Sequence, residues 1–119
     1  MMSDVDPGEA APASSAVVIA LTTLPLGADA AAFAEALVAE GLAACVSIGA
    51  PMTSVYTWRG AVERAEERQL IVKTVQGQVP RLKARLASLH PYEIPELLVL
   101  PAVDGGEAYL AWVRESAAG

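Results

Sequence analysis

Cysteine, histidine and aromatic residues are scarce in this 119-residue sequence. Cys45 is the single cysteine, His90 is the single histidine, and Phe, Trp and Tyr together make up 5% of the residues. A single cysteine excludes an intrachain disulfide, which favours a reducing compartment. The sequence also lacks a phosphate-binding glycine-rich motif and an evident Cys/His dyad. We therefore expect a binding or regulatory protein and not an enzyme.

Basic residues and long apolar runs are scarce as well. Eight Lys and Arg residues stand against fourteen Asp and Glu residues, for a formal net charge of -6, which disfavours binding to nucleic acid and to anionic membranes. No apolar run approaches the ~20 residues that span a bilayer, and the N-terminus lacks the pattern of a secretory signal. We expect a cytoplasmic protein with no nucleic-acid or membrane partner.

Apolar residues, in contrast, are abundant. The hydrophobic fraction is 54% and the charged fraction is 18%, which is apolar for a small domain whose surface must largely face water. Residues 1–15 are acidic, small or proline without a period, so we expect a disordered tail there. Residues 16–119 then form one domain, and we expect a partner to cover part of its apolar surface.

The longest β-rich stretch runs from Ala44 to Val75 and predicts two strands folded into a hairpin. β-Branched and aromatic residues are frequent in both arms, and Arg59-Gly60 lies in the tip region. Gly49-Ala50-Pro51 interrupts the first arm. Because proline cannot donate to a strand ladder, we expect a bulge or a bend at this position.

Helical and strand patterns alternate on both sides of the hairpin. The expected elements are a strand at 16–23, a helix from an Asp29 cap to Gly41, a helix from Val79-Pro80 to about His90, a strand at 96–103, and a last helix from an Asp104/Glu107 capping box. This βαββαβ order predicts an α+β, ferredoxin-like sandwich with both crossing helices on one face of the sheet. Every strand is apolar on both faces, so we expect further copies of the chain to cover the other face.

Three separated motifs allow a comparison with a known family. They are LAACVSIGAPMTSVYTWRG at 42–60, LIVKT at 70–74 and HPYEIPELLVLPAVDGGEAYLAWV at 90–113. In order and spacing they resemble the CutA family, the divalent-ion-tolerance proteins, which are similar to the PII signalling proteins, over about 17–115. The resemblance implies a homotrimer of ferredoxin-like subunits that acts in tolerance of copper and other divalent cations. No cofactor is required, and a divalent cation such as copper is the candidate ligand.

Lys73 is a lone charge within an apolar strand. A buried ammonium group needs a carboxylate or an anionic ligand nearby, for which Glu66, Glu67 and Glu96 are possible partners. Alternatively, it is an edge-strand lysine whose stem covers apolar surface while its head reaches water. The family resemblance favours a small-ligand site at a subunit boundary, formed by Glu66, Lys73, His90, Tyr92 and Glu96.

His90 and Cys45 are the candidate metal ligands. A helix C-terminus favours protonated histidine, whereas a metal needs neutral imidazole, so helix capping is the alternative role of His90. Cys45 lies between apolar residues and is alternatively an inert thiol. Some family members carry a further cysteine and a second histidine where this chain has Leu21 and Leu89. The sequence therefore leaves three hypotheses: a trimeric cation-tolerance protein, a PII-like sensor of a small anionic ligand, and an inert assembly scaffold.

Overall fold

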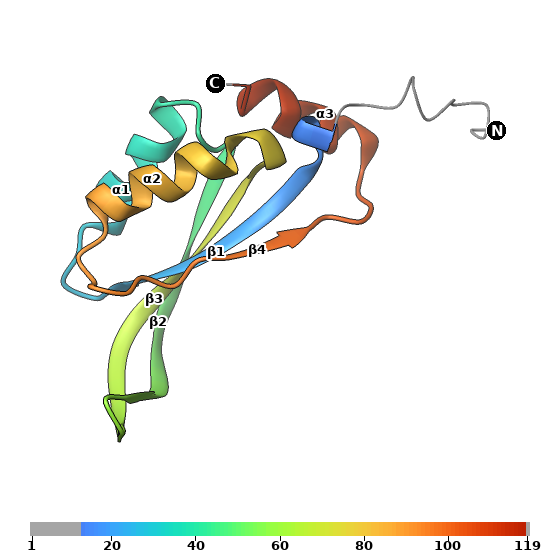
Figure 1. The fold of residues 1–119 in the computed structure, drawn as a ribbon. Helices are drawn as coiled ribbons and strands as arrows, with labels where there is room; N and C mark the ends of the chain where they lie inside the picture. Colours follow the sequence, from blue (N-terminus) through green and yellow to red (C-terminus); the bar gives the residue numbers. More distant parts are fainter. Residues whose placement is uncertain (1–12, 119) are drawn as a thin grey trace.

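Four antiparallel strands form one sheet, and two helices cover one of its faces (Figure 1). The computed structural model describes residues 13–118. In the sheet order β2-β3-β1-β4, the strands are β1 (Val17–Pro25), β2 (Cys45–Trp58), β3 (Ala61–Val75) and β4 (Leu98–Pro101). The helices are α1 (Ala30–Ala39), α2 (Val79–Leu89) and α3 (Glu107–Ser116), and short 3-10 turns lie at η3 (Ala13–Ser15) and η4 (Gln76–Gln78). The predicted ferredoxin-like order, with its long hairpin and terminal helix, is confirmed.

The predicted disordered tail lies mostly outside the described residues, which begin at residue 13. Its last three residues form η3, so the prediction of disorder is wrong for them. Arg114 donates to the Ser15 carbonyl at 3.2 Å, which ties this turn to α3. Gly77 of η4 also lies so close that a Cβ atom there would be 3.0 Å from the Ser14 carbonyl oxygen. These contacts give the turn an ordered position.

The two crossing helices begin and end where their local sequence signals predict. The Asp29 carboxylate accepts a hydrogen bond from the Ala32 amide at 3.0 Å and caps α1. Gly41 follows α1 with a φ of 73°, a conformation that favours glycine. His90 has extended backbone geometry because Pro91 follows it, and α2 ends at Leu89. Within residues 13–118, no helix is long and apolar enough to cross a bilayer.

The C-terminal elements differ from the prediction in two places. The Asp104/Glu107 capping box is wrong: Gly106 is the N-cap of α3 and makes no side-chain cap bond. The Asp104 carboxylate instead accepts a hydrogen bond from the Gly105 amide at 2.8 Å, because the helix starts too late for it to act as the cap. The last strand covers only Leu98–Pro101 of the expected 96–103. Pro101 ends β4, although the Ala102 amide still donates to the Val17 carbonyl at 3.1 Å.

The main core lies between the sheet and the helices α1 and α2. Alternate residues of the two central strands point to the helices, since Ala20 pairs with Val72 and Thr22 with Leu70, and all four are buried. The helices contribute Phe33, Leu37, Leu82 and Leu86 to the same cluster. Burying an aliphatic side chain of this size stabilises the fold by about 1.5 to 3 kcal/mol. This cluster is therefore the main source of stability in the subunit.

Within residues 13–118, the opposite face of the sheet is covered only at one end. There, α3 places Val113 and Ala117 against Val17, Ala44 and Val75. Five apolar side chains remain uncovered or half-covered on this open sheet face: Ile19, Leu21, Ile71, Leu98 and Leu100. Leu98 is 57% exposed and Leu100 is 47% exposed. The expectation that every strand is apolar on both faces is met for β1 and β4 but not for β3, whose distal half carries Glu63, Arg64, Glu66 and Glu67.

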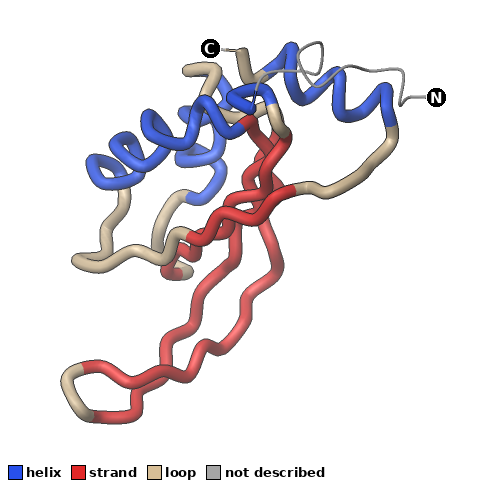
Figure 2. The backbone as a smooth tube through the Cα atoms, turned by 45° about the vertical axis from the view of Figure 1, so that its right-hand side comes forward, coloured by secondary structure: helices blue, strands red, loops and turns tan. Residues whose placement is uncertain are grey.

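The hairpin of β2 and β3 extends well beyond the rest of the sheet (Figure 2). Its pairing shifts between Ile48 and Pro51, so that Gly49 and Ala50 lie opposite Gln69, and the predicted bulge is confirmed. A Cβ atom at Gly49 would lie 3.1 Å from the Gln69 carbonyl oxygen, which explains the glycine. Because β1 pairs with β3 only from Glu67 onward, the part of the hairpin beyond this point is a two-stranded ribbon.

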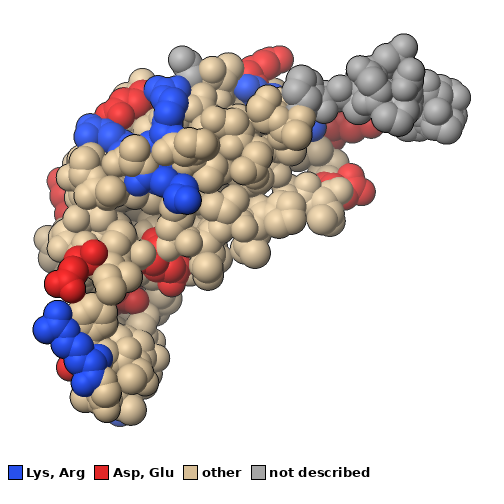
Figure 3. All heavy atoms as spheres, in the orientation of Figure 1, with Lys and Arg blue, Asp and Glu red and all other residues tan. Residues whose placement is uncertain are grey.

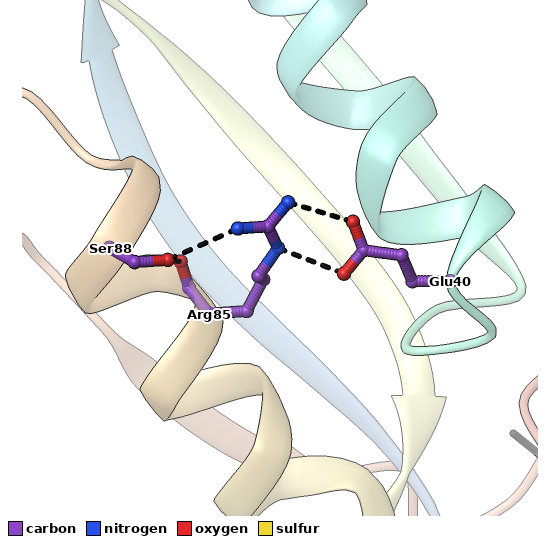
Figure 4. Close-up of polar contacts among 3 residues, drawn as sticks. All are labelled: Glu40, Arg85 and Ser88. Carbon is purple, nitrogen blue, oxygen red and sulfur yellow. Dashed lines mark hydrogen bonds and ion pairs between the residues drawn. The ribbon is translucent and has the colours of Figure 1, made fainter.

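A pair of charged side chains joins the two crossing helices (Figure 4). Arg85 of α2 donates from Nε and one terminal nitrogen to the two carboxylate oxygens of Glu40, at 2.8 and 2.9 Å, just past the end of α1. Arg85 also contacts Ser88 at 3.2 Å. The hydrogen bonds from Arg85 lower the pKa of the Glu40 carboxyl below its usual value. The pair links α2 to the residue just past the end of α1 at the surface.

Candidate functional site

A hollow lies along the hairpin ribbon, from Glu67 to Trp58 near the tip, beside the loop that follows α2. Its volume is about 240 Å³. Three kinds of residue line this hairpin cleft: aromatic residues, carboxylates and two apolar residues, namely Tyr56, Trp58, Tyr92, Glu63, Glu67, Glu93, Ala65 and Ile94. Glu63, Ala65 and Glu67 are alternate residues of β3, so the strand pleat turns all three to the same face.

The link between the ribbon and the loop is a hydrogen bond from Tyr92 to Glu67. The Tyr92 hydroxyl donates to Oε2 of Glu67 at 2.8 Å, and Glu67 is only 8% exposed. Burial, together with the hydrogen bond and negative charge of Glu67, raises the pKa of Tyr92 to about 12. The phenol therefore keeps its proton at physiological pH and remains a donor to the carboxylate.

His90 is buried beside Tyr92 and uses both of its ring nitrogens. Nε2 lies 2.6 Å from the Thr23 carbonyl oxygen, and Nδ1 accepts a hydrogen bond from the Tyr92 amide at 3.1 Å. A carbonyl oxygen only accepts and an amide only donates, so these partners select the neutral imidazole with its proton on Nε2. The ring centre lies 5.0 Å from that of Tyr92. His90 thus fastens the loop after α2 to β1.

Lys73 lies on the open sheet face, away from the cleft. Its Nζ is 3.3 Å from the Ser47 hydroxyl and 4.0 Å from the Cys45 sulfur. No carboxylate of the described residues lies within ion-pair distance of Lys73, so the suggested partners Glu66, Glu67 and Glu96 do not reach it within one subunit. The alternative is wrong in placing Lys73 on an edge strand, because β3 lies between β2 and β1. The half-buried Lys73 still agrees with a stem that covers apolar surface.

Glu66 and Glu96 occupy separate positions as well. Glu66 points to the opposite face of the ribbon from Glu67 and accepts a hydrogen bond from the Thr53 hydroxyl. Glu96 is half-buried, and its Oε2 is buried without a hydrogen-bond partner among the described residues. Of the five predicted ligand residues, the structure brings only His90 and Tyr92 together within one subunit.

Distances along β3 separate the remaining candidates. Lys73 and Glu67 are six residues apart on this strand, which corresponds to about 20 Å. Cys45 pairs with Lys73, whereas His90 contacts Thr23, whose partner is Gln69. Cys45 thus pairs with one position of β3, and His90 contacts the β1 partner of another position that is four residues away, roughly 13 Å along the strand. Among residues 13–118, no group of three or more His, Cys, Asp or Glu residues is placed to hold a metal ion.

Sequence analysis missed four residues of the cleft as ligand candidates: Tyr56, Trp58, Glu63 and Glu93. Tyr56 lies opposite Glu63 in the ribbon, and Trp58 lies opposite Ala61. Alternation along each arm would have grouped these residues if the pairing register had been known. The register depends on the one extra residue of β2 at the bulge, and the sequence alone did not fix that number.

The cleft is acidic, and a cation of the same chain already lies at its rim. Figure 3 shows acidic and basic side chains next to each other along the hairpin. The Arg59 guanidinium lies 3.5 Å from the Glu93 carboxylate and 5.2 Å from the centre of the Trp58 ring. This is the geometry of a cation–π contact. The aromatic and acidic groups of this surface thus bind a guanidinium within the chain.

Comparison with known proteins assigns the family. The family described as CutA1 divalent ion tolerance protein matches residues 18–116. The chain belongs to the CutA1 family. The divalent-cation tolerance protein CutA of Thermus thermophilus is 45% identical over 98 residues, which are 82% of this chain and 95% of that protein. The human protein CutA is 37% identical over 123 residues, covering 97% of this chain and 69% of that protein.

Solved structures of CutA proteins have the same fold. The Thermus thermophilus structure, 44% identical, gives a TM-score of 0.81 and covers 84% of this chain and 97% of that one. The structure from Synechococcus elongatus, 40% identical, gives a TM-score of 0.80 with coverages of 89% and 94%. The resemblance found in the three sequence motifs is therefore confirmed over the whole domain.

Proposed function

We propose that this CutA1-family protein acts in divalent-cation tolerance, as a homotrimer and through binding or regulation rather than catalysis. The observation that carries the proposal is the 45% identity to a protein named for divalent-cation tolerance, over 95% of that protein's length. A cytoplasmic location, and the absence of nucleic-acid and membrane partners, remain predictions from the sequence.

A growth assay tests the cellular role. A bacterial strain without its own CutA protein, expressing this chain, should grow at higher copper concentrations than the same strain with an empty vector. Zinc and cobalt challenges show whether the effect extends to other divalent cations. Equal growth with and without the chain, at matched expression, would contradict the tolerance role.

The open sheet face supports the homotrimer. Leu98 and Leu100 place apolar surface next to Ile19 and Leu21, and burial of such surface stabilises an assembly by about 25 cal/mol per Å². Closed symmetry lets identical copies cover this face without forming a fibre. Light scattering should give a mass about three times that of the 12.3 kDa chain.

Leu98→Asp should shift the protein to monomers, because it places a charge in the proposed interface. Val38→Asp is the matched control, since Val38 is exposed on α1, in the helical layer. Light scattering of the two variants at one protein concentration makes the comparison. A monomeric wild-type protein, or identical masses for the two variants, would contradict the assembly.

Direct copper binding by His90 and Cys45 remains a separate prediction. In one subunit, a metal at His90 must displace either the Thr23 carbonyl or the Tyr92 amide. A copper titration followed by absorption spectroscopy tests it: the prediction requires a stoichiometric signal that His90→Ala and Cys45→Ser each remove. An unchanged titration in either variant would exclude that residue as a ligand.

The position of Lys73 favours a second candidate, a PII-like sensor of a small anionic ligand. Its ammonium group is half-buried and has no carboxylate partner among the described residues, so an anion would neutralise it. A thermal-shift panel of nucleotides and small carboxylates should then show stabilisation that Lys73→Ala abolishes.

An inert assembly scaffold, the third hypothesis, predicts retained trimers and no stabilisation by any metal or metabolite.

A further inference from the structure

Helix α2 carries charge of one sign only. It contains Arg81, Lys83 and Arg85 but no Asp or Glu between Val79 and Leu89, in a chain whose net charge is -6. Figure 3 shows basic side chains over the helical layer. This layer lies on the other side of the sheet from the proposed trimer interface. The charges of α2 therefore stay accessible when the open sheet face is covered.

Two of these cations have no carboxylate partner in the part of the chain that the structure describes. Arg85 pairs with Glu40. Arg81 instead donates to the neutral Gln78 side chain at 2.9 Å, and Lys83 makes no ion pair there. Arg81 and Arg85 lie one helical turn apart on the flank nearest Glu40, and Lys83 lies on the other flank. An acidic segment along the exposed ridge between the flanks can thus reach cations on both sides.

Residues 1–12 have the complementary charge. Asp4, Asp6 and Glu9 are acidic, and this segment contains no Lys or Arg. It joins the described chain at η3, and the Gln76 amide of η4, just before α2, donates to the carbonyl of Ala16, just after η3, at 2.8 Å. Twelve extended residues reach roughly 40 Å, whereas the 11 residues of α2 rise about 16 Å. All three carboxylates can therefore reach the helix.

We propose that the acidic segment 1–12 docks on α2 of its own chain, with its carboxylates beside Arg81, Lys83 and Arg85. Exposed ion pairs are individually weak, but attachment next to α2 gives the segment a high local concentration at the helix. The docked segment neutralises α2 and hinders anionic molecules in solution from binding there. The proposal is independent of cation tolerance and of the assembly, so its test needs neither a growth phenotype nor a trimer.

A charge-neutral segment tests the docking in the full-length protein. Amide NMR spectra of the isotope-labelled wild type are compared with those of the triple variant Asp4→Asn/Asp6→Asn/Glu9→Gln. At about 0.02 M NaCl the signals of α2 should differ between the two proteins, and at about 0.5 M NaCl they should converge, because salt screens exposed charges. Glu63→Gln/Glu66→Gln removes exposed carboxylates from the hairpin ribbon and should leave the α2 signals unchanged. Identical α2 signals of wild type and triple variant at low salt would overturn the proposal.

A matched pair of variants tests the same contact from the helix. Lys83→Gln should shift the signals of Asp4 and Asp6 toward their high-salt positions and lower the docked-to-free ratio by up to about fivefold, the range of an exposed ion pair. Arg64→Gln removes the same charge from an exposed position of the hairpin ribbon and should leave those signals in place. Dilution should not change the wild-type spectrum. Equal effects of the two variants, or a shift that disappears on dilution, would overturn docking within the chain.

Discussion

The two halves of β3 have the same backbone pattern but opposite surroundings. In the half that pairs with β1, Leu70 and Val72 are fully buried under the helices. In the distal half, Val62 is 77% exposed and only β2 is paired with the strand. A two-stranded hairpin alone is only marginally stable in water. The comparison indicates that the proximal half holds the subunit together, while the distal half carries the cleft.

The largest expected effect comes from the same substitution made in each half. Val72→Ala should lower the free energy of unfolding by about 2 to 3 kcal/mol, because it removes buried methyl groups and leaves a cavity. Val62→Ala should change it by less than about 0.5 kcal/mol. Urea unfolding at one protein concentration measures both. Similar losses for the two variants would mean that the distal half contributes to the core as much as the proximal half does.

Removal of the bond between the loop and the ribbon should have an intermediate effect. Tyr92→Phe leaves the Glu67 carboxylate buried without its donor, at an expected cost of about 1 to 2 kcal/mol. Tyr109→Phe is the control, because this tyrosine is exposed on α3. Urea unfolding at pH 7 compares the two. Equal stability of both variants and the wild type would show that the link at the cleft is not stabilising.

The same tyrosine should make the protein sensitive to alkali. Folding raises the pKa of Tyr92 from its ordinary value near 10 to about 12, so the folded state holds its proton more tightly than the unfolded chain. The resulting stabilisation is complete below about pH 10 and is lost as the pH rises to about 12. The stability difference between wild type and Tyr92→Phe should therefore shrink across this window in thermal unfolding. A constant difference would contradict the assignment.

The smallest effect is expected at the Glu40–Arg85 pair on the helical layer. Arg85 lowers the pKa of Glu40 in the folded state, so the stabilisation is present above the ordinary pKa near 4.5 and disappears as the pH falls below it. A double-mutant cycle with Glu40→Gln and Arg85→Gln should give a small coupling that salt weakens. Glu35→Gln, on the exposed face of α1, is the control. A coupling that added salt leaves unchanged would contradict the ion-pair explanation.

Features set by neighbouring residues were predictable from the sequence. Asp29 caps α1, Pro91 ends α2 at the residue before His90, and Gly49-Ala50-Pro51 marks the bulge, because each depends on a few adjacent residues. The family motifs also made the order of the strands in the sheet predictable. The capping box at Asp104 failed because the start of α3 depends on packing against β1 and β3, which a local pattern does not contain.

The candidate site was less predictable because it depends on strand register and on distance along a strand. Glu66 and Glu67 are adjacent in sequence but lie on opposite faces, and the bulge decides which residues of β2 they meet. Lys73 lies in a motif of its own, yet six residues of extended chain separate it from Glu67. The family motifs therefore predicted a single ligand site from residues that lie far apart within one subunit.

The bulge at Gly49 acts as a joint at which the ribbon leaves the body of the molecule. Beyond Glu67, the two arms pair only with each other among the described strands, so the sheet does not fix their length. Two residues added to each arm would extend the ribbon by about 7 Å and return every side chain to its original face. The length of the ribbon can thus evolve independently of the sheet that supports it, whereas the cleft stays where Tyr92 bonds to Glu67.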